Sequence, residues 1–207
     1  MTKYKFTESW SNNQERPLWD GILSAIKIER VLEVGSFEGA TVCYLIDKLG
    51  QENNLEFHCI DTWEGGREHQ IQRKDMSLVE ANFEYNTNLA ISNSKQSVSI
   101  KKYKNKSDVS LSTLLSEGKS DYFDFVYIDG SHEASDVLCD AILGFKLLKH
   151  NGFMIFDDYL WKPSSELNSL LDPLGIPKPA IDAFINIYIR QLRVLTAPLE
   201  QLFIQKY

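Results

Sequence analysis

The segment from Asp124 to Asp158 constrains the fold more than any other part of the chain. Two short apolar runs, 125–128 and 153–156, each end in aspartate. Between them, apolar residues recur at helical spacing over 137–148. A continuous apolar run is typical of a parallel strand that is buried on both faces of a sheet. The pattern therefore predicts a strand, a helix and a second strand parallel to the first.

Three aspartates follow the two predicted strands, Asp129 after the first and Asp157 and Asp158 after the second. The carboxyl ends of neighbouring parallel strands meet at one edge of a sheet, where ligands bind in open α/β folds. Carboxylates that are brought together repel one another and raise each other's pKa unless a cation or a polar ligand compensates. We therefore predict a divalent-cation or polar-ligand site there. The alternative is that these aspartates cap a helix or a loop.

A glycine turn follows an earlier predicted strand, in the stretch Val31-Leu-Glu-Val-Gly35-Ser-Phe-Glu-Gly39-Ala-Thr41. Gly35 and Gly39 would let the backbone approach a ligand closely, and would leave amides at a helix N-terminus available for an anion or a carboxylate. The spacing is G-x-x-x-G and differs from the G-x-G-x-x-G fingerprint of dinucleotide-binding proteins. A tight turn without a ligand is therefore the alternative.

Asp61 ends the next predicted strand, 56–60, and follows Gly39 by about 20 residues. An acidic residue at this spacing is placed to accept hydrogen bonds from ribose hydroxyls. Thr62 and Trp63 come next and could flank a purine, although Trp63 could equally pack within the loop. The glycine turn and the acid together are more specific than either one alone.

The rest of the chain continues the alternation of strands and helices. Ser77 and Glu80 form a capping-box pattern before a helix, and a strand is expected over 98–103. Four of the six prolines lie close together after Asp158, at positions 163, 173, 177 and 179. We predict that residues 159–178 form an active-site loop or lid. A helix beginning at Pro179 and two final strands, over 192–196 and 201–207, are expected to follow.

Length and composition are those of one globular domain. The chain has 207 residues, of which 43% are hydrophobic and 25% charged. We accordingly expect a single domain over 1–207 that starts with an N-terminal arm and helix over 1–30. The three cysteines are far apart and lie in apolar segments, so neither a disulfide framework nor a cysteine metal site is expected. Since no signal peptide or apolar run of about 18 residues is found, we predict a cytoplasmic protein that does not enter a membrane.

The charge of the chain bears on its partners. A formal net charge of -7 disfavours nucleic acid, because phosphate binding usually needs a basic face. One basic cluster surrounds Tyr103, formed by Lys101, Lys102, Lys104 and Lys106. Lysines that alternate near a strand more often protect a sheet edge or are solvated. A nucleic-acid partner would require a broader basic face.

The ordered motifs give the sequence a resemblance to class I S-adenosylmethionine-dependent methyltransferases. It is most similar to the small-molecule O-methyltransferase-like group (methyltransferase family 24 type), in which V-L-E-V-G-S-x-E-G, I-D-T-W, Y-I-D-G-S-H and I-F-D-D-Y recur in this order. The similarity runs from about Val31 to the C-terminus. It implies a Rossmann-like, doubly wound α/β fold with helices on both faces. The seven-stranded sheet would have the order 3-2-1-4-5-7-6 with strand 7 antiparallel.

The resemblance also implies roles for individual residues. Glu33 would organise the glycine loop, and Asp61 would hold the ribose hydroxyls. Asp129 would contribute to the cofactor site as well as to catalysis. The methionine part of the cofactor would be held by Gly35, Ser36, Gly39 and Thr41, and the adenine would be surrounded by Thr62, Ser107 and Asp108, with Trp63 as a further candidate.

Metal-dependent catechol-type O-methyltransferases resemble the chain at a further place. Asp129, Asp157 and Asp158 stand at the Mg²⁺-binding positions of that group, with Asp158 replacing an asparagine. His132 stands where that group has its catalytic lysine. Imidazole titrates near neutrality and is a sensible substitute as the base. A capping or packing role at the start of the helix is the alternative for His132.

We therefore expect a methyltransferase that uses S-adenosylmethionine and Mg²⁺ to methylate a hydroxyl of a small molecule, with His132 and Asp129 as catalytic residues. The alternatives are a protein that binds S-adenosylmethionine without turnover, a nucleic-acid methyltransferase and a nucleotide-cofactor oxidoreductase. The last of these lacks the full dinucleotide fingerprint. A homo-oligomer is left open.

Overall fold

The computed structural model describes residues 3–8, 19–162, 174–197 and 200–207. Strands and helices alternate along most of this part of the chain. The strands are β1 (Arg30–Val34), β2 (Leu55–Asp61), β3 (Val98–Lys104), β4 (Phe123–Ile128), β5 (Leu148–Phe156), β6 (Leu192–Leu195) and β7 (Leu202–Lys206). The helices are α1 (Asp20–Ala25), α2 (Ala40–Leu49), α3 (Arg67–Ile71), α4 (Met76–Asn93), α5 (Ser107–Ser116), α6 (Ala134–Leu147) and α7 (Lys178–Tyr188).

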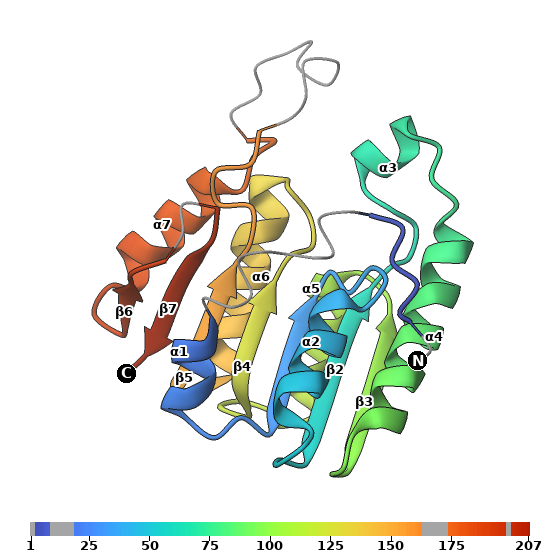
Figure 1. The fold of residues 1–207 in the computed structure, drawn as a ribbon. Coiled ribbons are helices and arrows are strands. Elements are labelled where there is room, and N and C mark those ends of the chain that lie inside the picture. The colour runs from blue at the N-terminus through green and yellow to red at the C-terminus, as the bar shows by residue number, and fades with distance from the viewer. Residues whose placement is uncertain (1–2, 9–18, 163–173, 198–199) are drawn as a thin grey trace.

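The strands form one seven-stranded sheet in the order β3-β2-β1-β4-β5-β7-β6 (Figure 1). β1 to β5 pair in parallel, whereas β7 is antiparallel to both of its neighbours, β5 and β6. The predicted fold class, strand order and antiparallel seventh strand are thus confirmed. Because β1 to β5 run in the same direction, their carboxyl ends lie at one edge of the sheet, where ligands bind in such folds.

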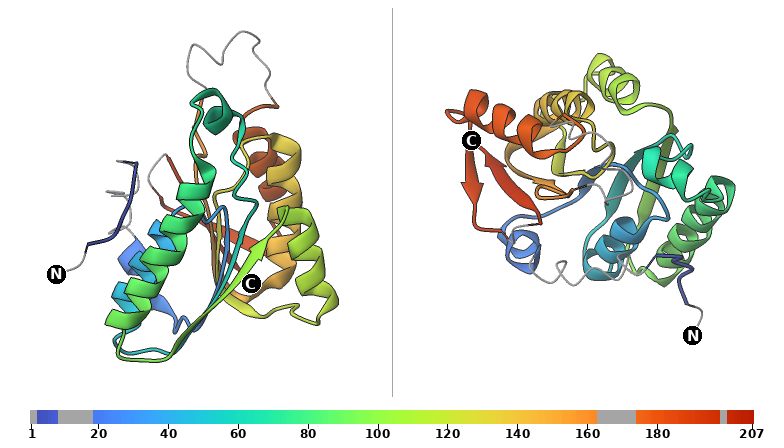
Figure 2. Two further views of the ribbon diagram at one scale, coloured as in Figure 1. Left: turned by 90° about the vertical axis from the view of Figure 1, so that its right-hand side faces the viewer. Right: turned by 90° about the horizontal axis from the view of Figure 1, so that it is seen from above.

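Helices cover both faces of the sheet, as the edge-on view in Figure 2 shows. One face packs against α1, α2 and α4 through residues such as Trp19, Val42 and Phe83. The other face packs against α5, α6 and α7 through residues such as Leu114 and Phe184. All six residues of β4 are buried, which explains why its sequence is continuously apolar apart from Asp124.

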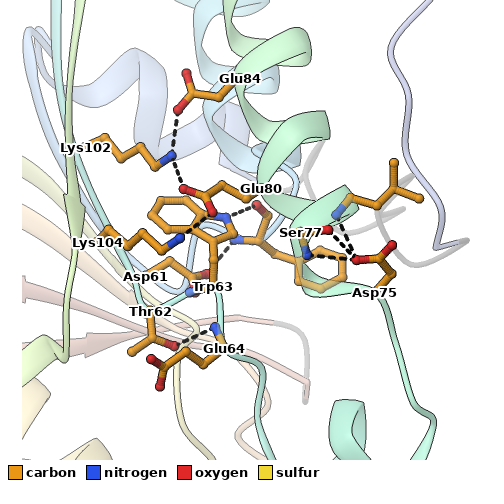
Figure 3. A network of polar contacts seen from close by, with 12 residues as sticks. Asp61, Thr62, Trp63, Glu64, Asp75, Ser77, Glu80, Glu84, Lys102 and Lys104 are labelled. Carbon is orange, nitrogen blue, oxygen red and sulfur yellow. Dashed lines mark hydrogen bonds and ion pairs between the residues drawn. The ribbon is translucent and has the colours of Figure 1, made fainter.

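The start of α4 differs from the predicted capping box. The N-cap residue is Asp75, whose carboxylate accepts hydrogen bonds from the amides of Ser77 and Leu78 at 3.1 and 3.3 Å (Figure 3). The helix therefore begins at Met76, before the predicted cap, because aspartate is as good a cap as serine and precedes it here. Glu80 is instead paired with Lys102 and Lys104 across to β3.

The lysines of β3 are largely neutralised by neighbouring acids. Lys102 contacts Glu80 at 2.7 Å and Glu84 at 2.6 Å (Figure 3), and Lys101 contacts Glu56 at 3.4 Å. β3 is an edge strand of the sheet, which agrees with lysines that protect an edge.

In the described part of the chain, no helix combines the length and the apolar character that crossing a membrane requires.

Two predicted segments are described only in part. Within the expected N-terminal arm and helix over 1–30, residues 1–2 and 9–18 lie outside the described residues. Within the expected loop or lid over 159–178, residues 163–173 do so. The single domain over 1–207 and its lid therefore stay predictions.

Lys206 is a buried cation that ties the end of β7 to α6 and β5. Its Nζ donates to the Asp121 carboxylate at 2.7 Å and to the carbonyls of Phe145 and Leu148 at 2.9 and 2.6 Å. Lys206→Met would leave these carbonyls without their donor, so we expect a loss of about 2–4 kcal/mol in the free energy of unfolding. Urea denaturation measures this loss, with exposed Lys146→Met as the control. Equal stability of the two variants would contradict the assignment.

Candidate active site

A cavity of about 990 Å³ lies at the carboxyl ends of the parallel strands. The loops that follow β1, β2, β3, β4 and β5 all contribute to its walls. The structure thus brings most of the predicted site residues together. Those that line the cavity are Gly35, Asp61, Thr62, Ser107, Asp108, Asp129, His132, Asp157 and Asp158. Of the other predicted residues, Glu33, Ser36, Thr41 and Trp63 are buried, and Gly39 is the N-cap residue of α2.

Gly35 allows the ends of three strands to meet. Its amide donates to the carbonyl of Ile60 at 2.8 Å, and the amide of Asp129 donates to the carbonyl of Val34 at 2.8 Å. The backbone of Gly35 has φ +88°, and a Cβ added there would lie 1.8 Å from the carbonyl oxygen of Asp129. Any side chain at this position would therefore force β1 and β4 apart.

Asp61 ties the glycine loop to the end of β2. Its carboxylate accepts hydrogen bonds from the amides of Phe37 at 2.8 Å and Trp63 at 2.7 Å. Burial raises the pKa of Asp61, and these two amides oppose that effect by stabilising the charged form. A carboxylate has about four acceptor positions, so the cavity-lining Asp61 keeps capacity for further donors such as hydroxyl groups.

The structure favours the alternative for Trp63, which is packing within the loop. The side chain is 4% exposed, and its indole nitrogen donates to the carbonyl of Phe37 at 2.9 Å. Its ring packs against Phe83, and the ammonium of Lys102 lies 4.4 Å from the ring centre (Figure 3). Trp63 therefore supports the loop from behind and is not among the cavity-lining residues that the structure describes.

Glu38 is a structural centre of the glycine loop that the sequence did not single out. Its carboxylate is 1% exposed and accepts from the amide and hydroxyl of Thr7 at 2.7 and 2.9 Å and from Asn82 at 2.9 Å. These bonds fix residues 3–8 beside α4 and the glycine loop (Figure 1). In the sequence, the position of Glu38 between Gly35 and Gly39 was a signal of a role in the loop. That position did not indicate that Thr7 of the N-terminal arm would be its partner.

His132 is oriented by a carboxylate. Its Nε2 lies 2.9 Å from Oδ2 of Asp158, and its ring centre lies 4.0 Å from that of Trp161. The N-cap residue of α6 is Glu133, so His132 does not cap this helix. An imidazole held by a carboxylate at the wall of a cavity is a typical arrangement for a general base.

Asp157 is held by two side-chain donors. The hydroxyl of Tyr127 donates to Oδ2, and Nε2 of Gln201 donates to Oδ1 at 3.0 Å. Burial raises the pKa of Asp157 and the neighbouring charge of Asp158 adds to this, while the two donors act in the opposite direction. Neither Tyr127 nor Gln201 was a predicted site residue.

The side chains do not form the predicted Mg²⁺ site as they stand. Over residues 3–8, 19–162, 174–197 and 200–207, no three histidine, cysteine, aspartate or glutamate side chains form a group that could hold a metal ion. The carboxylate of Asp157 is turned to Tyr127 and Gln201, and that of Asp158 to His132. Since Mg²⁺ demands near-octahedral oxygen ligands, this arrangement does not fit it.

Asp140 is a further acidic residue of the cavity wall that sequence reasoning missed. It lies on α6 and is 1% exposed. Burial raises the pKa of Asp140 to about 7, the hydroxyl of Ser107 opposes this change, and the charges of Asp136 and Asp108 add to it. The position of Asp140 within the helical repeat resembled that of an ordinary buried helix residue.

The sequence of the chain matches a known family. A family model described as a methyltransferase domain matches residues 32–159, which is more than half of the chain. The chain belongs to this methyltransferase family. A search of curated proteins gave no match to the methyltransferase.

Solved structures share the fold of the methyltransferase. An O-methyltransferase from Bacillus cereus, in complex with SAH, has a TM-score of 0.62 at 14% identity and covers 100% of this chain and 84% of its own. TomG of Streptomyces achromogenes, involved in tomaymycin synthesis and in complex with SAM, has a TM-score of 0.62 at 15% identity and covers 91% and 77%. MycE of the mycinamycin biosynthetic pathway, in complex with Mg and SAH, has a TM-score of 0.57 at 14% identity and covers 92% and 49%.

Proposed function

We propose that this methyltransferase transfers the methyl group of S-adenosylmethionine to a hydroxyl of a small molecule. The observation that carries the proposal is that one cavity is lined by Gly35 and Asp61 at one part and by the pair His132 and Asp158 at another. The first two residues suit a nucleoside cofactor, and the pair suits proton removal. The solved B. cereus structure contains S-adenosylhomocysteine (SAH) and the TomG structure contains S-adenosylmethionine (SAM), which supports this cofactor.

The charge of the cavity suits the cofactor. Its described walls carry many more carboxylates than lysines. S-adenosylmethionine bears a positive sulfonium, so these carboxylates favour it over its neutral product. When bound, the cofactor supplies a methyl group that is already activated, and the remaining task of the protein is alignment and proton removal. Asp61 would hold the ribose, while Ser107 and Asp108 would lie near the base.

His132 would remove the proton from the acceptor hydroxyl. A carboxylate only accepts hydrogen bonds, so Asp158 fixes the proton of the neutral imidazole on Nε2. The basic lone pair is then on Nδ1, which is buried. Because Trp161 packs on the ring, we propose that it moves aside when the acceptor enters. Asp129 lines the same cavity and would help to orient the acceptor.

Mg²⁺ assistance is kept as part of the proposal because Asp129, Asp157 and Asp158 share one cavity and offer hard oxygen ligands. That role would require the carboxylates of Asp157 and Asp158 to leave Tyr127, Gln201 and His132, so the rest of the proposal does not depend on it. The Mg in the MycE structure supports this possibility for the present chain.

A panel of phenols, catechols and sugars tests the proposal, with SAH formation as the readout, in excess Mg²⁺ and after chelation. We expect turnover of at least one hydroxylated acceptor, and a drop of about tenfold or more after chelation would show that a cation takes part. Turnover that survives chelation unchanged would reassign the three aspartates to cofactor or acceptor binding. Tight cofactor binding without turnover of any acceptor would favour a binding protein.

A nucleic-acid acceptor is the weaker alternative. The lysines of β3 are engaged by Glu80, Glu84 and Glu56, so they do not extend into a broad basic face. The net charge of -7 acts in the same direction. DNA and RNA oligonucleotides in the acceptor panel would test it directly.

A further inference from the structure

A buried line of hydrogen bonds runs from the first helix of the methyltransferase to the cavity. The indole nitrogen of Trp19 donates to Oε1 of Gln201 at 2.9 Å. Nε2 of Gln201 donates in turn to Oδ1 of Asp157 at 3.0 Å. Trp19 is fully buried and Gln201 is 2% exposed. The amide group of Gln201, which precedes β7, therefore joins Trp19 before α1 to Asp157 after β5.

Chemistry determines the orientation of that amide. An indole N–H can only donate, so the oxygen of Gln201 must face Trp19 and the NH₂ group must face Asp157. The hydroxyl of Tyr127 donates to the other carboxylate oxygen of Asp157. Each oxygen of this carboxylate thus has its own donor, which fixes the plane of the group and not only its position.

Packing alone does not explain a glutamine at this position. Burial of an amide without hydrogen bonds costs about 1–3 kcal/mol, and its bonds do little more than offset that cost. An apolar side chain of similar length would fill the space between Trp19 and Asp157, but it would leave the indole N–H and one oxygen of Asp157 without these partners. The specific property of Gln201 is that it turns a donor toward the carboxylate of Asp157, a residue that lines the cavity together with Asp158 and His132.

We propose that Gln201 is a positioning residue, anchored by Trp19, that holds the Asp157 carboxylate in the orientation needed at the acceptor end of the cavity. This inference rests on the proposed function. Asp158 repels Asp157, so a carboxylate that lost one of its donors would turn away from its present position. Gln201 would then affect turnover through Asp157 while leaving the nucleoside end of the cavity untouched.

Gln201→Met tests the proposal, because methionine keeps the length of the side chain and removes both of its polar groups. Gln205→Met is the matched control on the same segment, since Gln205 is also buried but donates to the carbonyl of Asn151 and not to Asp157. In crystal structures we expect the Asp157 carboxylate to rotate in Gln201→Met and to stay in place in Gln205→Met. This readout requires no acceptor.

Kinetics with the best acceptor of the panel give the second readout. We expect Gln201→Met to lower kcat by about 10- to 100-fold, the usual effect of losing a partner that orients a functional group, with the SAH dissociation constant changed less than about 2-fold. Trp19→Phe should cause a smaller loss, and no further loss in the Gln201→Met background, because both act through one amide.

An Asp157 carboxylate that keeps its position in Gln201→Met would overturn the proposal, as would additive effects of Trp19→Phe and Gln201→Met on kcat. A loss of SAH affinity equal to the loss of kcat would show a general structural role and would overturn it too. If the wild-type protein bound no SAH, the proposed function would fail, while the crystallographic comparison would still decide the role of Gln201.

Discussion

Replacing Asp61 with alanine should weaken the binding of S-adenosylhomocysteine by about 10- to 150-fold, which corresponds to about 1.5–3 kcal/mol. The carboxylate would be lost as an acceptor for the ribose hydroxyls. The amides of Phe37 and Trp63, which Asp61 binds, would also lose their partner. Because the second loss loosens the glycine loop itself, the effect should lie toward the upper end of this range.

Calorimetric titration measures this change, and circular dichroism checks that the variant is folded. Glu64→Gln is the matched control, because it removes a negative charge from an exposed residue of the same cavity wall without touching the glycine loop. Its affinity should stay within about 2-fold of the wild type if simple attraction of charge is a small part of the effect. A folded Asp61→Ala variant with unchanged affinity would show that the cofactor binds elsewhere.

His132→Ala should lower turnover by about 10²- to 10⁴-fold and leave the affinity for S-adenosylhomocysteine nearly intact. Methyl transfer to a hydroxyl requires removal of a proton, and His132 is the imidazole that Asp158 orients at the cavity wall. Exposed His150 provides the control, since it lies away from the cavity and His150→Ala should turn over normally.

The pH dependence of turnover tests the same role from another side. A base must be neutral to accept a proton, so turnover in the wild type should rise with pH as an imidazole loses its own proton. This acidic limb should disappear in His132→Ala. If the variant retained both full turnover and the same limb, His132 would be structural and another group would remove the proton.

The strands and helices were predictable because their signals are local. The apolar runs 125–128 and 153–156 form the buried ends of β4 and β5. The cap of α4 was missed because Asp75 and Ser77 both satisfy the local rule, and only the three-dimensional structure shows which one binds the helix amides.

The location of the site was predictable for a related reason. Residues that follow parallel strands must lie at one edge, so Asp129, Asp157 and Asp158 were expected to meet, and all three line the cavity. The orientation of each side chain was not predictable. It depends on partners distant in sequence, such as Gln201 for Asp157 and Thr7 for Glu38, and no local pattern encodes those pairs.

Titration of the folded wild-type protein with S-adenosylmethionine and S-adenosylhomocysteine in a calorimeter tests the central claim most directly. The geometry of Gly35, Asp61 and the acidic cavity predicts that both ligands bind once per chain, and that binding weakens in Asp61→Ala but not in His132→Ala. If neither ligand bound to the folded protein, the cavity would not be a methyl-donor site and the proposed function would be wrong.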